Sequence, residues 1–278
     1  KHGVIHRTFS RAEDGSFDFE ALEDVCTESG SNLRLVSIPH VSNLDGVSAP
    51  VKEVSRVAHD FGAEVLVDAA QSVPHKAIDV EDLGCDYLAF SLHKMLGPSG
   101  VGVLWGKEQA LASLETISGG GMTVRSVSDD SVEFRPIPDR LEGGLANFAG
   151  IAGAGAATDY LSELNMVEVE EHESRLNRII HEGVMGVDGV EIIGPSDPSQ
   201  RGGITSLQIE GIDPHVVAVM LDEAASVFVR SGYHCVDSWF QSQSESHLGS
   251  LRVSPYLYNT EEEVRQFVDT FEEIVSVL

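Results

Sequence analysis

The segments VLVDAAQSVPH (65–75) and DYLAFSLHKMLGPSGVGVLW (86–105) carry the clearest strand pattern of this chain. The run EVLVDAA (64–70) is short and apolar and is closed by an aspartate and small residues, a pattern typical of a parallel strand buried on both faces. DYLAFSL (86–92) is a second such run, and VGVLW (101–105) is a third. We therefore predict three neighbouring strands of one sheet.

Strands and helices alternate around this stretch. RLVSIP (34–39) predicts a further strand, while PVKEVSRVAHDFG (50–62) and KEQALASLE (107–115) predict helices. This order is typical of right-handed crossovers over a parallel sheet. We therefore expect an α/β fold with a mainly parallel sheet in a large domain that spans residues 1–160.

Residues 161–278 predict a smaller α+β domain. Asp213 and Thr260 are expected helix N-caps, the second in a capping box with Glu263. The elements predicted from about residue 150 onward are helices near 150–163 and 166–185, strands VEII (190–193) and GITSLQI (203–209), helix DPHVVAVMLDEAA (213–225), strands SVFV (226–229) and LRVS (251–254), and a final helix from Thr260.

Asp68 and Lys94 follow the first two strands of the opening stretch. Ligands of open α/β sheets collect beyond the carboxyl ends of the strands, so both side chains are expected on the ligand side. A lysine amine can form a Schiff base with the aldehyde of pyridoxal phosphate, and a carboxylate beside the pyridine nitrogen keeps that nitrogen protonated. The alternative for Lys94 is a solvated strand end. The pairing predicts a pyridoxal phosphate site.

The two runs 65–75 and 86–105 together resemble the core of the class V aminotransferase family, and within it the cysteine desulfurases. The resemblance extends from HVSN (40–43) to RVSPYLYNT (252–260). It implies a fold type I pyridoxal phosphate enzyme in which Lys94 carries the cofactor and Asp68 pairs with the pyridinium nitrogen.

The resemblance also implies roles for four polar side chains around the cofactor. Two of them would bind its phenolic oxygen and two its phosphate, although each could instead satisfy local backbone groups. The first two are Gln71 and Asn43, and the second two are Ser91 and His93.

Cys235 distinguishes the desulfurases from their relatives. Cys26 lies in a predicted helix and Cys85 precedes a strand, so both are expected to be buried. Cys235 lies instead in RSGYHCVDSW (230–239), beside His234 and five residues after Arg230, and nearby cations would favour its thiolate. The motif resembles the R-x-G-x-H-C signature of Suf-type desulfurases, which depend on a separate sulfur-acceptor protein. The alternative is a surface loop with an incidental thiol.

The resemblance implies L-cysteine desulfuration that feeds iron–sulfur cluster assembly, with a persulfide on Cys235 and release of alanine. Arg252 would bind the substrate carboxylate with its planar fork, and Arg230 would assist the cofactor or the loop. A selenocysteine lyase or an epimerase-like relative could share these motifs. A third hypothesis is a non-catalytic fragment that binds a partner subunit.

Two features depart from the family pattern. The chain enters the pattern partway along, without the upstream glycine and threonine phosphate loop or the histidine that stacks on the ring, so we expect a fragment or an incomplete gene product, which a complementary chain could complete. In RLEGGLAN (140–147), Leu145 stands where the family has a threonine that reaches the cofactor phosphate of the neighbouring subunit. The backbone amides of Gly144 and Leu145 could still donate. Gly119–Gly121 resembles another loop at the interface of a family homodimer.

The composition predicts a surface adapted to high salt. The formal net charge is −27, with 45 acidic side chains against 18 Lys plus Arg. An acidic tail and an acidic docking face are the alternatives, but the carboxylates are spread along the chain in clusters such as EVEEHE (168–173) and EEEVRQ (261–266). Strong salt would screen the resulting self-repulsion. No basic run is present for nucleic-acid binding.

Cysteine and histidine usage indicates the compartment. The 3 cysteines have no paired spacing and the 11 histidines are scattered, so we expect a reducing cytoplasm and no metal site. The longest small-residue run, AGIAGAGAA (149–157), is too short to span a membrane.

Overall fold

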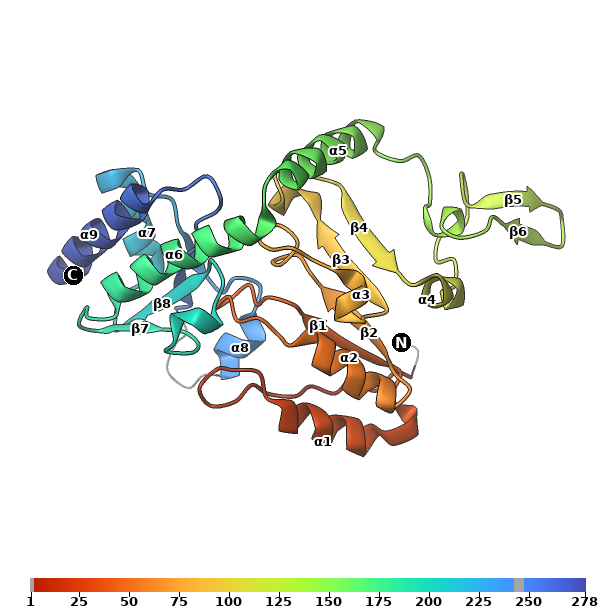
Figure 1. Ribbon diagram of the computed structural model, residues 1–278, viewed down its shortest axis with the longest axis horizontal. Coiled ribbons are helices and arrows are strands. Elements are labelled where there is room, and N and C mark those ends of the chain that lie inside the picture. The colour runs from red at the N-terminus through yellow and green to blue at the C-terminus, as the bar shows by residue number, and fades with distance from the viewer. Residues whose placement is uncertain (1–2, 243–247) are drawn as a thin grey trace.

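The first sheet contains the residues of the opening stretch. The structure, a computed structural model, describes residues 3–242 and 248–278. The sheet has the order β1-β2-β3-β4, formed by Leu35–Pro39, Glu64–Asp68, Tyr87–Ser91 and Gly102–Gly106. β1, β2 and β3 are parallel, as predicted, and β4 is antiparallel to β3 (Figure 1).

The reversed direction of β4 corrects the prediction of three parallel strands. A parallel neighbour needs a crossover of about a dozen or more residues, usually a helix. The connection from β3 to β4, residues 92–101, contains only the 3-10 turn η2 (Leu92–Lys94), so the chain turns back on itself. β4 is also the edge strand, with Val103 and Leu104 exposed, rather than a strand buried on both faces.

Helices pack against the first sheet, and the hydrophobic core of this half lies between them and the strands. Val54 of α2 (Val51–Asp60) is fully buried against Val65 and Val67 of β2, which alternate with half-exposed residues. The other helical elements of this half are α1 (Phe19–Ser29), η1 (Gly30–Asn32), α3 (Val80–Leu83) and α4 (Glu108–Ser113).

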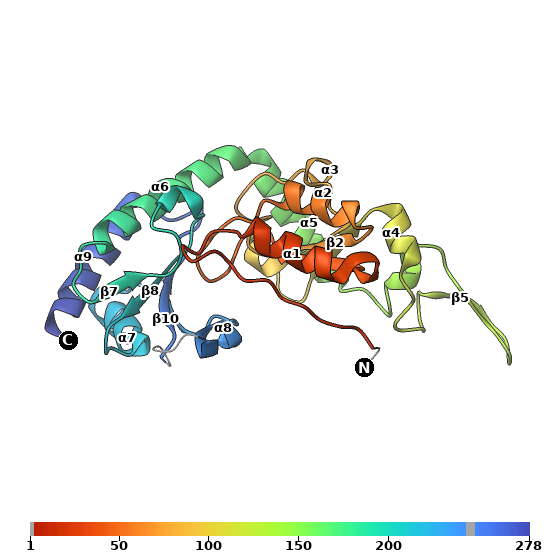
Figure 2. The same ribbon diagram turned by 90° about the horizontal axis from the view of Figure 1, so that it is seen from below.

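A projecting arm and a long helix connect the two halves. The arm contains the hairpin of β5 (Val124–Val127) and β6 (Val132–Phe134), which extends away from the body of the molecule, followed by η3 (Asp139–Leu141) (Figures 1 and 2). Helix α5 (Phe148–Glu163) returns the chain to the first sheet and leads into α6 (Met166–Val184).

The second half is an antiparallel sheet of order β7-β8-β10-β9 covered by α6, α7 and α9. Its core includes the fully buried Leu176, Leu207, Leu221 and Phe271. The elements are β7 (Val190–Ile192), η4 (Pro198–Gln200), β8 (Thr205–Ile209), α7 (Pro214–Ala225), β9 (Arg230–Gly232), α8 (Asp237–Ser242), β10 (Ser250–Val253) and α9 (Glu261–Val277).

The predicted helix caps are confirmed, but one predicted strand is wrong. Asp213 accepts a hydrogen bond from the His215 N–H, and Thr260 forms the predicted capping box with Glu263. SVFV (226–229) is not a strand, because Ser226 adopts a left-handed conformation (φ 53°) that ends α7, and pairing with β10 starts only at Arg230. Within the described residues, no helix is long and apolar enough to span a membrane.

Candidate active site

Lys94 is held by a tight turn at the end of β3. Leu92, at the start of this turn, is 2% exposed, and its N–H donates to the Val101 carbonyl. Its own carbonyl accepts from the N–H groups of Met95 and Gly97 at 3.0 and 2.9 Å. The buried leucine therefore fixes the backbone, while the half-buried Lys94 side chain faces a cavity.

This cavity, which we call the Lys94 cavity, lies between the two halves of the molecule. Its volume is about 290 Å³, just below the usual range for small-molecule sites. Residues of both halves line it: Val41, Gln71, His75, Lys76, His93 and Lys94 from the first, and Glu170, Glu173, Ser174, Gly202, Gly203, Ile204, Arg252, Ser254, Pro255, Tyr256 and Tyr258 from the second.

The structure brings four of the predicted site residues to the cavity wall: Gln71, His93, Lys94 and Arg252. The other five, Asn43, Asp68, Ser91, Arg230 and Cys235, lie outside its lining. Asp68 ends β2 with an exposed carboxylate, whose Oδ1 accepts from the Ala70 N–H at 2.9 Å. Ser91 ends β3, in register with Gly102 of β4.

Arg252 reaches the cavity wall with only some of its guanidinium donors used in hydrogen bonds. Its Nη1 donates to the Asn43 carbonyl at 2.8 Å, and its buried Nε has no partner among the described residues. Arg230 lies directly opposite on the neighbouring strand. Burial first, and then the charge of Arg230, lower the pKa of Arg252. A guanidinium with free donors beside a cavity is suited to bind a carboxylate.

The segment that carries Cys235 has an unusual backbone. His234 (φ 50°) and Cys235 (φ 64°) are both left-handed, which costs roughly 1–3 kcal/mol at each non-glycine residue. His234 compensates through Nε2, which donates to the Ser250 carbonyl at 3.0 Å, and through its own carbonyl, which accepts from Asn43 Nδ2 at 2.6 Å. These contacts hold Cys235 with its side chain exposed.

The ends of the cysteine segment approach each other closely. Gly249 is left-handed (φ 82°), and a Cβ there would lie 2.5 Å from the Gly232 carbonyl oxygen. Only glycine fits this approach. The two ends of the segment therefore form a narrow neck, and residues 243–247 between them lie outside the described part of the chain.

His234 does not supply one of the nearby cations that the sequence led us to expect around Cys235. Burial, followed by the charge of Arg252, lowers the pKa of His234 to about 4, so its ring is neutral near neutral pH. Among the causes that set the pKa of Arg252, the residue predicted to bind substrate, Cys235 is the smallest, and it opposes the lowering.

Most of the cavity wall was not predicted from the sequence, including a group of three residues in mutual contact. Glu173 belongs to the acidic cluster 168–173, yet it is 2% exposed and accepts from His75 Nδ1 at 2.9 Å. Burial raises its pKa, and the bond from His75 opposes this shift. Tyr256 contacts the same histidine ring. The only sequence signal was the pattern of α6, because Glu173, Leu176 and Ile180 share one helical face.

The cavity concentrates positive charge in an acidic protein. Lys76 and Lys94 are two of only five lysines in the chain, and Arg252 joins them at the wall. The opposing carboxylates are Glu170 and Glu173. Cations that line a cleft raise the local concentration of anionic ligands. Among the described residues, no cluster of ligating side chains suits a metal ion.

Comparison with known proteins identifies the family. Residues 1–267 match the family model described as Aminotransferase class-V. The chain belongs to the aminotransferase class-V family. Members of this family, including the cysteine desulfurases, depend on pyridoxal phosphate.

Curated relatives of this chain are named cysteine desulfurases. The chain is 38% identical to a probable cysteine desulfurase from Methanothermobacter thermautotrophicus, over 100% of this chain and 68% of the relative. It is 35% identical to a cysteine desulfurase from Haloferax volcanii, over 98% of this chain and 62% of the relative. The chain thus spans about two thirds of the length of these relatives.

Solved class-V structures share the fold. The apo structure of a cysteine desulfurase from Thermococcus onnurineus superposes with a TM-score of 0.90 at 34% identity, covering 98% of this chain and 66% of that one. A cysteine desulfurase from Escherichia coli, with an S-sulfonic acid, superposes with a TM-score of 0.87 at 27% identity, covering 96% and 65%. The fold type I assignment is therefore confirmed.

The groups at the class-V site fit the family cofactor. The cavity wall offers an amine, an amide and an imidazole, from Lys94, Gln71 and His93. The exposed carboxylate of Asp68 ends the strand next to the one that Lys94 follows. An amine suits an aldehyde carbon, and a carboxylate suits a protonated ring nitrogen.

Proposed function

We propose that this chain carries the catalytic centre of a pyridoxal phosphate-dependent L-cysteine desulfurase. The observation that supports this best is the exposed Cys235, whose left-handed neighbour His234 is held by Asn43, the residue that also accepts from Arg252 at the Lys94 cavity. The proposed cofactor-binding amine and carboxylate-binding cation share one cavity, and the thiol lies on a segment bonded to the same loop as that cation. The similarity to proteins named cysteine desulfurases supports the same activity.

Residues of the first half would hold the cofactor. Lys94 would bind its aldehyde carbon, and Asp68 its ring nitrogen. When bound, the cofactor supplies an electron-withdrawing ring that stabilises negative charge at the substrate Cα. The other contacts in this proposal are Gln71 and Asn43 to the phenolic oxygen, and Ser91 and His93 to the phosphate.

The substrate would be oriented by charge. Arg252 would bind the carboxylate of L-cysteine through the donors that Asn43 leaves free. Arg230, opposite Arg252 on β9, adds positive charge to the same place. The substrate amine would take the place of the Lys94 amine at the cofactor, and the freed Lys94 amine would take the Cα proton as general base.

Cys235 would accept the sulfur. Its thiolate attacks the substrate Sγ, a new S–S bond forms, and the substrate Cβ–Sγ bond breaks. The electron pair of the broken bond stays with carbon, which takes up protons and leaves as L-alanine. Because the Cys235 side chain is exposed, the persulfide sulfur is open to an acceptor protein that supplies iron–sulfur cluster assembly.

A second copy of the chain would complete the assembly. Ile117, Leu145 and Phe148 are 99%, 86% and 69% exposed, and they lie in and beside the arm that contains Gly119–Gly121. Such side chains are usually covered by a partner. We propose a homodimer with the site at its interface, in which the Gly144 and Leu145 amides face the partner's cofactor. The reducing cytoplasm would keep the exposed Cys235 thiol free.

Absorption spectroscopy tests the function. Protein purified in high salt and mixed with pyridoxal phosphate is expected to show a visible band that Lys94→Ala abolishes. Cys235→Ala should keep this band and lose sulfide release from L-cysteine. Absence of a band in the unmodified protein would favour a non-catalytic fragment, and faster turnover of L-selenocysteine than of L-cysteine would favour a selenocysteine lyase.

A further inference from the structure

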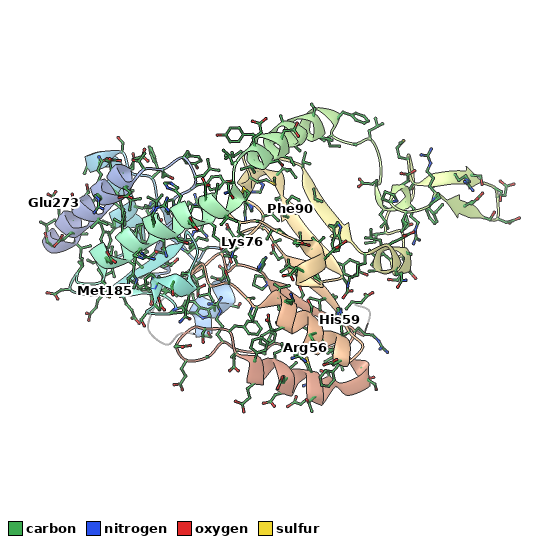
Figure 3. All side chains as sticks on the ribbon, viewed as in Figure 1. Arg56, His59, Lys76, Phe90, Met185 and Glu273 are labelled. Carbon is green, nitrogen blue, oxygen red and sulfur yellow. The ribbon has the colours of Figure 1, made fainter. Side chains whose placement is uncertain are left out.

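At the wall of the Lys94 cavity, residues of the second half bind a short segment of the first half. The segment, Pro74–Lys76, follows the turn after β2. His75 Nδ1 donates to Glu173 Oε2 at 2.9 Å, and Lys76 Nζ forms an ion pair with Glu170 Oε1 at 2.9 Å. Both glutamates lie on one face of α6. Figure 3 shows Lys76 where α6 passes the end of the first sheet.

The loop between β10 and α9 also contacts this segment. The Tyr256 hydroxyl donates to the Pro74 carbonyl at 2.9 Å. The ring of Tyr256 also meets the His75 ring edge-on, with centroids 4.8 Å apart. His172 on α6 binds the Asn259 carbonyl at 2.9 Å, which joins α6 to this loop. We call His75, Glu173 and Tyr256 the clamp.

The clamp is linked by short connections to groups on both sides of the cavity. On the first side, the His75 and Lys76 N–H groups both donate to the Ser72 carbonyl at 3.0 Å, so the turn that carries Gln71 moves with His75. On the second side, Tyr256 follows Arg252 by four residues. A displacement at His75 would therefore change the position of Gln71 relative to Arg252.

Glu173 is a costly residue for a role in packing alone. It is 2% exposed, and its Oε1 is buried without a partner among the described residues. A buried carboxylate with an unfilled lone pair destabilises a fold relative to an apolar side chain of similar size. Its contact with His75 at the cavity wall gives the residue a use that an apolar side chain could not supply.

We propose that His75 and Glu173 are positioning residues, which hold the two halves at the separation that lets a ligand span the Lys94 side and Arg252. The inference rests on the proposed function, because it names the substrate carboxylate as the group that Arg252 receives. The clamp sets the distance between Arg252 and the Lys94 side of the cavity. It thereby favours an amino acid of the length of cysteine.

The test uses Glu173→Leu, Glu173→Gln and His75→Asn in the full chain. 3-Mercaptopropionate, which has the thiol and carboxylate of cysteine but no amine, serves as the probe of Arg252, with its Kd measured by calorimetry without cofactor. Glu173→Leu is expected to raise this Kd and the KM for L-cysteine about tenfold, the effect of one lost hydrogen bond to a charged group. The kcat and the visible band should stay within about twofold of the unmodified protein.

Two comparisons separate positioning from simple loss of stability. Glu173→Gln keeps an oxygen acceptor for His75, so it should recover most of the affinity that Glu173→Leu loses. Asn177→Leu removes a buried polar group one turn further along α6 and away from the cavity, and should lower the melting temperature without changing Kd or KM. If Glu173→Leu and His75→Asn gave the same Kd and the same KM as Asn177→Leu, the proposed positioning role would be overturned.

The unmodified chain separates this inference from the proposed function. If it forms the visible band and binds 3-mercaptopropionate, the variants decide the clamp. If it shows neither property, the proposed function fails in the unmodified protein, and the positioning role falls with it.

Discussion

Asn43 donates from Nδ2 to the carbonyl oxygen of His234 at 2.6 Å, across 191 positions of sequence. The same residue accepts from Arg252 at its own carbonyl. One loop of the first half thus fixes both the backbone beside Cys235 and the cation predicted to bind substrate. The cysteine and the carboxylate site are therefore mechanically coupled.

Removal of the Asn43 amide should loosen the cysteine segment. Asn43→Ala deletes the bond that helps to hold His234 and Cys235 left-handed, so we expect sulfide release to fall about tenfold, the effect of one lost hydrogen bond. The rate at which iodoacetamide alkylates Cys235 should also change in this variant. Cys26 and Cys85 are buried and should react more slowly than Cys235. Gln71→Ala is the control, and an unchanged Cys235 alkylation rate in Asn43→Ala would contradict the coupling.

The neutral state of His234 predicts a pH dependence. Its pKa is about 4 in the folded chain and 6.5 as a free side chain, so between these values the unfolded chain binds more protons. The stabilisation is complete above pH 6.5 and is lost as the pH falls toward 4. His40, also with a pKa of about 4, adds to the same window.

His234→Gln isolates the share of His234 in this pH dependence. Glutamine can keep the donor to Ser250 and cannot titrate. Urea unfolding at pH 7.5 and pH 5, at one salt concentration, should show a smaller acid loss of unfolding free energy in this variant. An identical loss in both proteins would show that His234 is not desolvated.

The sequence predicted the residue types of the site better than their contacts. Lys94 and Asp68 follow parallel strands whose apolar runs are visible in sequence, so their common side of the sheet could be predicted. The direction of β4 depended on a turn too short for a crossover, which apolar periodicity does not encode. The burial of Glu173 depended on Tyr256 and His75, which approach from distant segments, so an acidic cluster could not reveal it.

The capping box of α9 contributes to stability independently of the site. Thr260 accepts from the Glu263 N–H and Glu263 accepts from the Thr260 N–H, at 3.2 and 2.9 Å. Thr260→Ala removes the first bond and should lower the free energy of unfolding by about 1 kcal/mol. Thr158→Ala, on exposed α5, is the matched control and should change it by less than about 0.5 kcal/mol. Equal values in the two variants, measured by urea unfolding, would argue against the cap.

The acidic surface predicts stabilisation by salt. With a net charge of −27, the folded chain repels itself at low ionic strength, and the Debye length falls from about 10 Å at 0.1 M to about 3 Å at 1 M. We expect the melting temperature to rise steadily from 0.1 to 2 M KCl. A melting temperature that is flat or falls over this range would contradict adaptation of the surface to high salt.

Arg252→Lys tests whether geometry or charge binds the substrate. Lysine keeps the positive charge but loses the planar fork, which here already spends Nη1 on the Asn43 carbonyl. Its single ammonium group cannot serve both that carbonyl and a bidentate carboxylate. The KM for L-cysteine should therefore rise at least about tenfold, corresponding to ~1.4 kcal/mol of lost binding, while the visible band of the cofactor stays unchanged. Arg265→Lys, in an exposed pair on α9, should leave KM at the value of the unmodified protein. A KM for Arg252→Lys equal to that control would mean that Arg252 supplies charge alone.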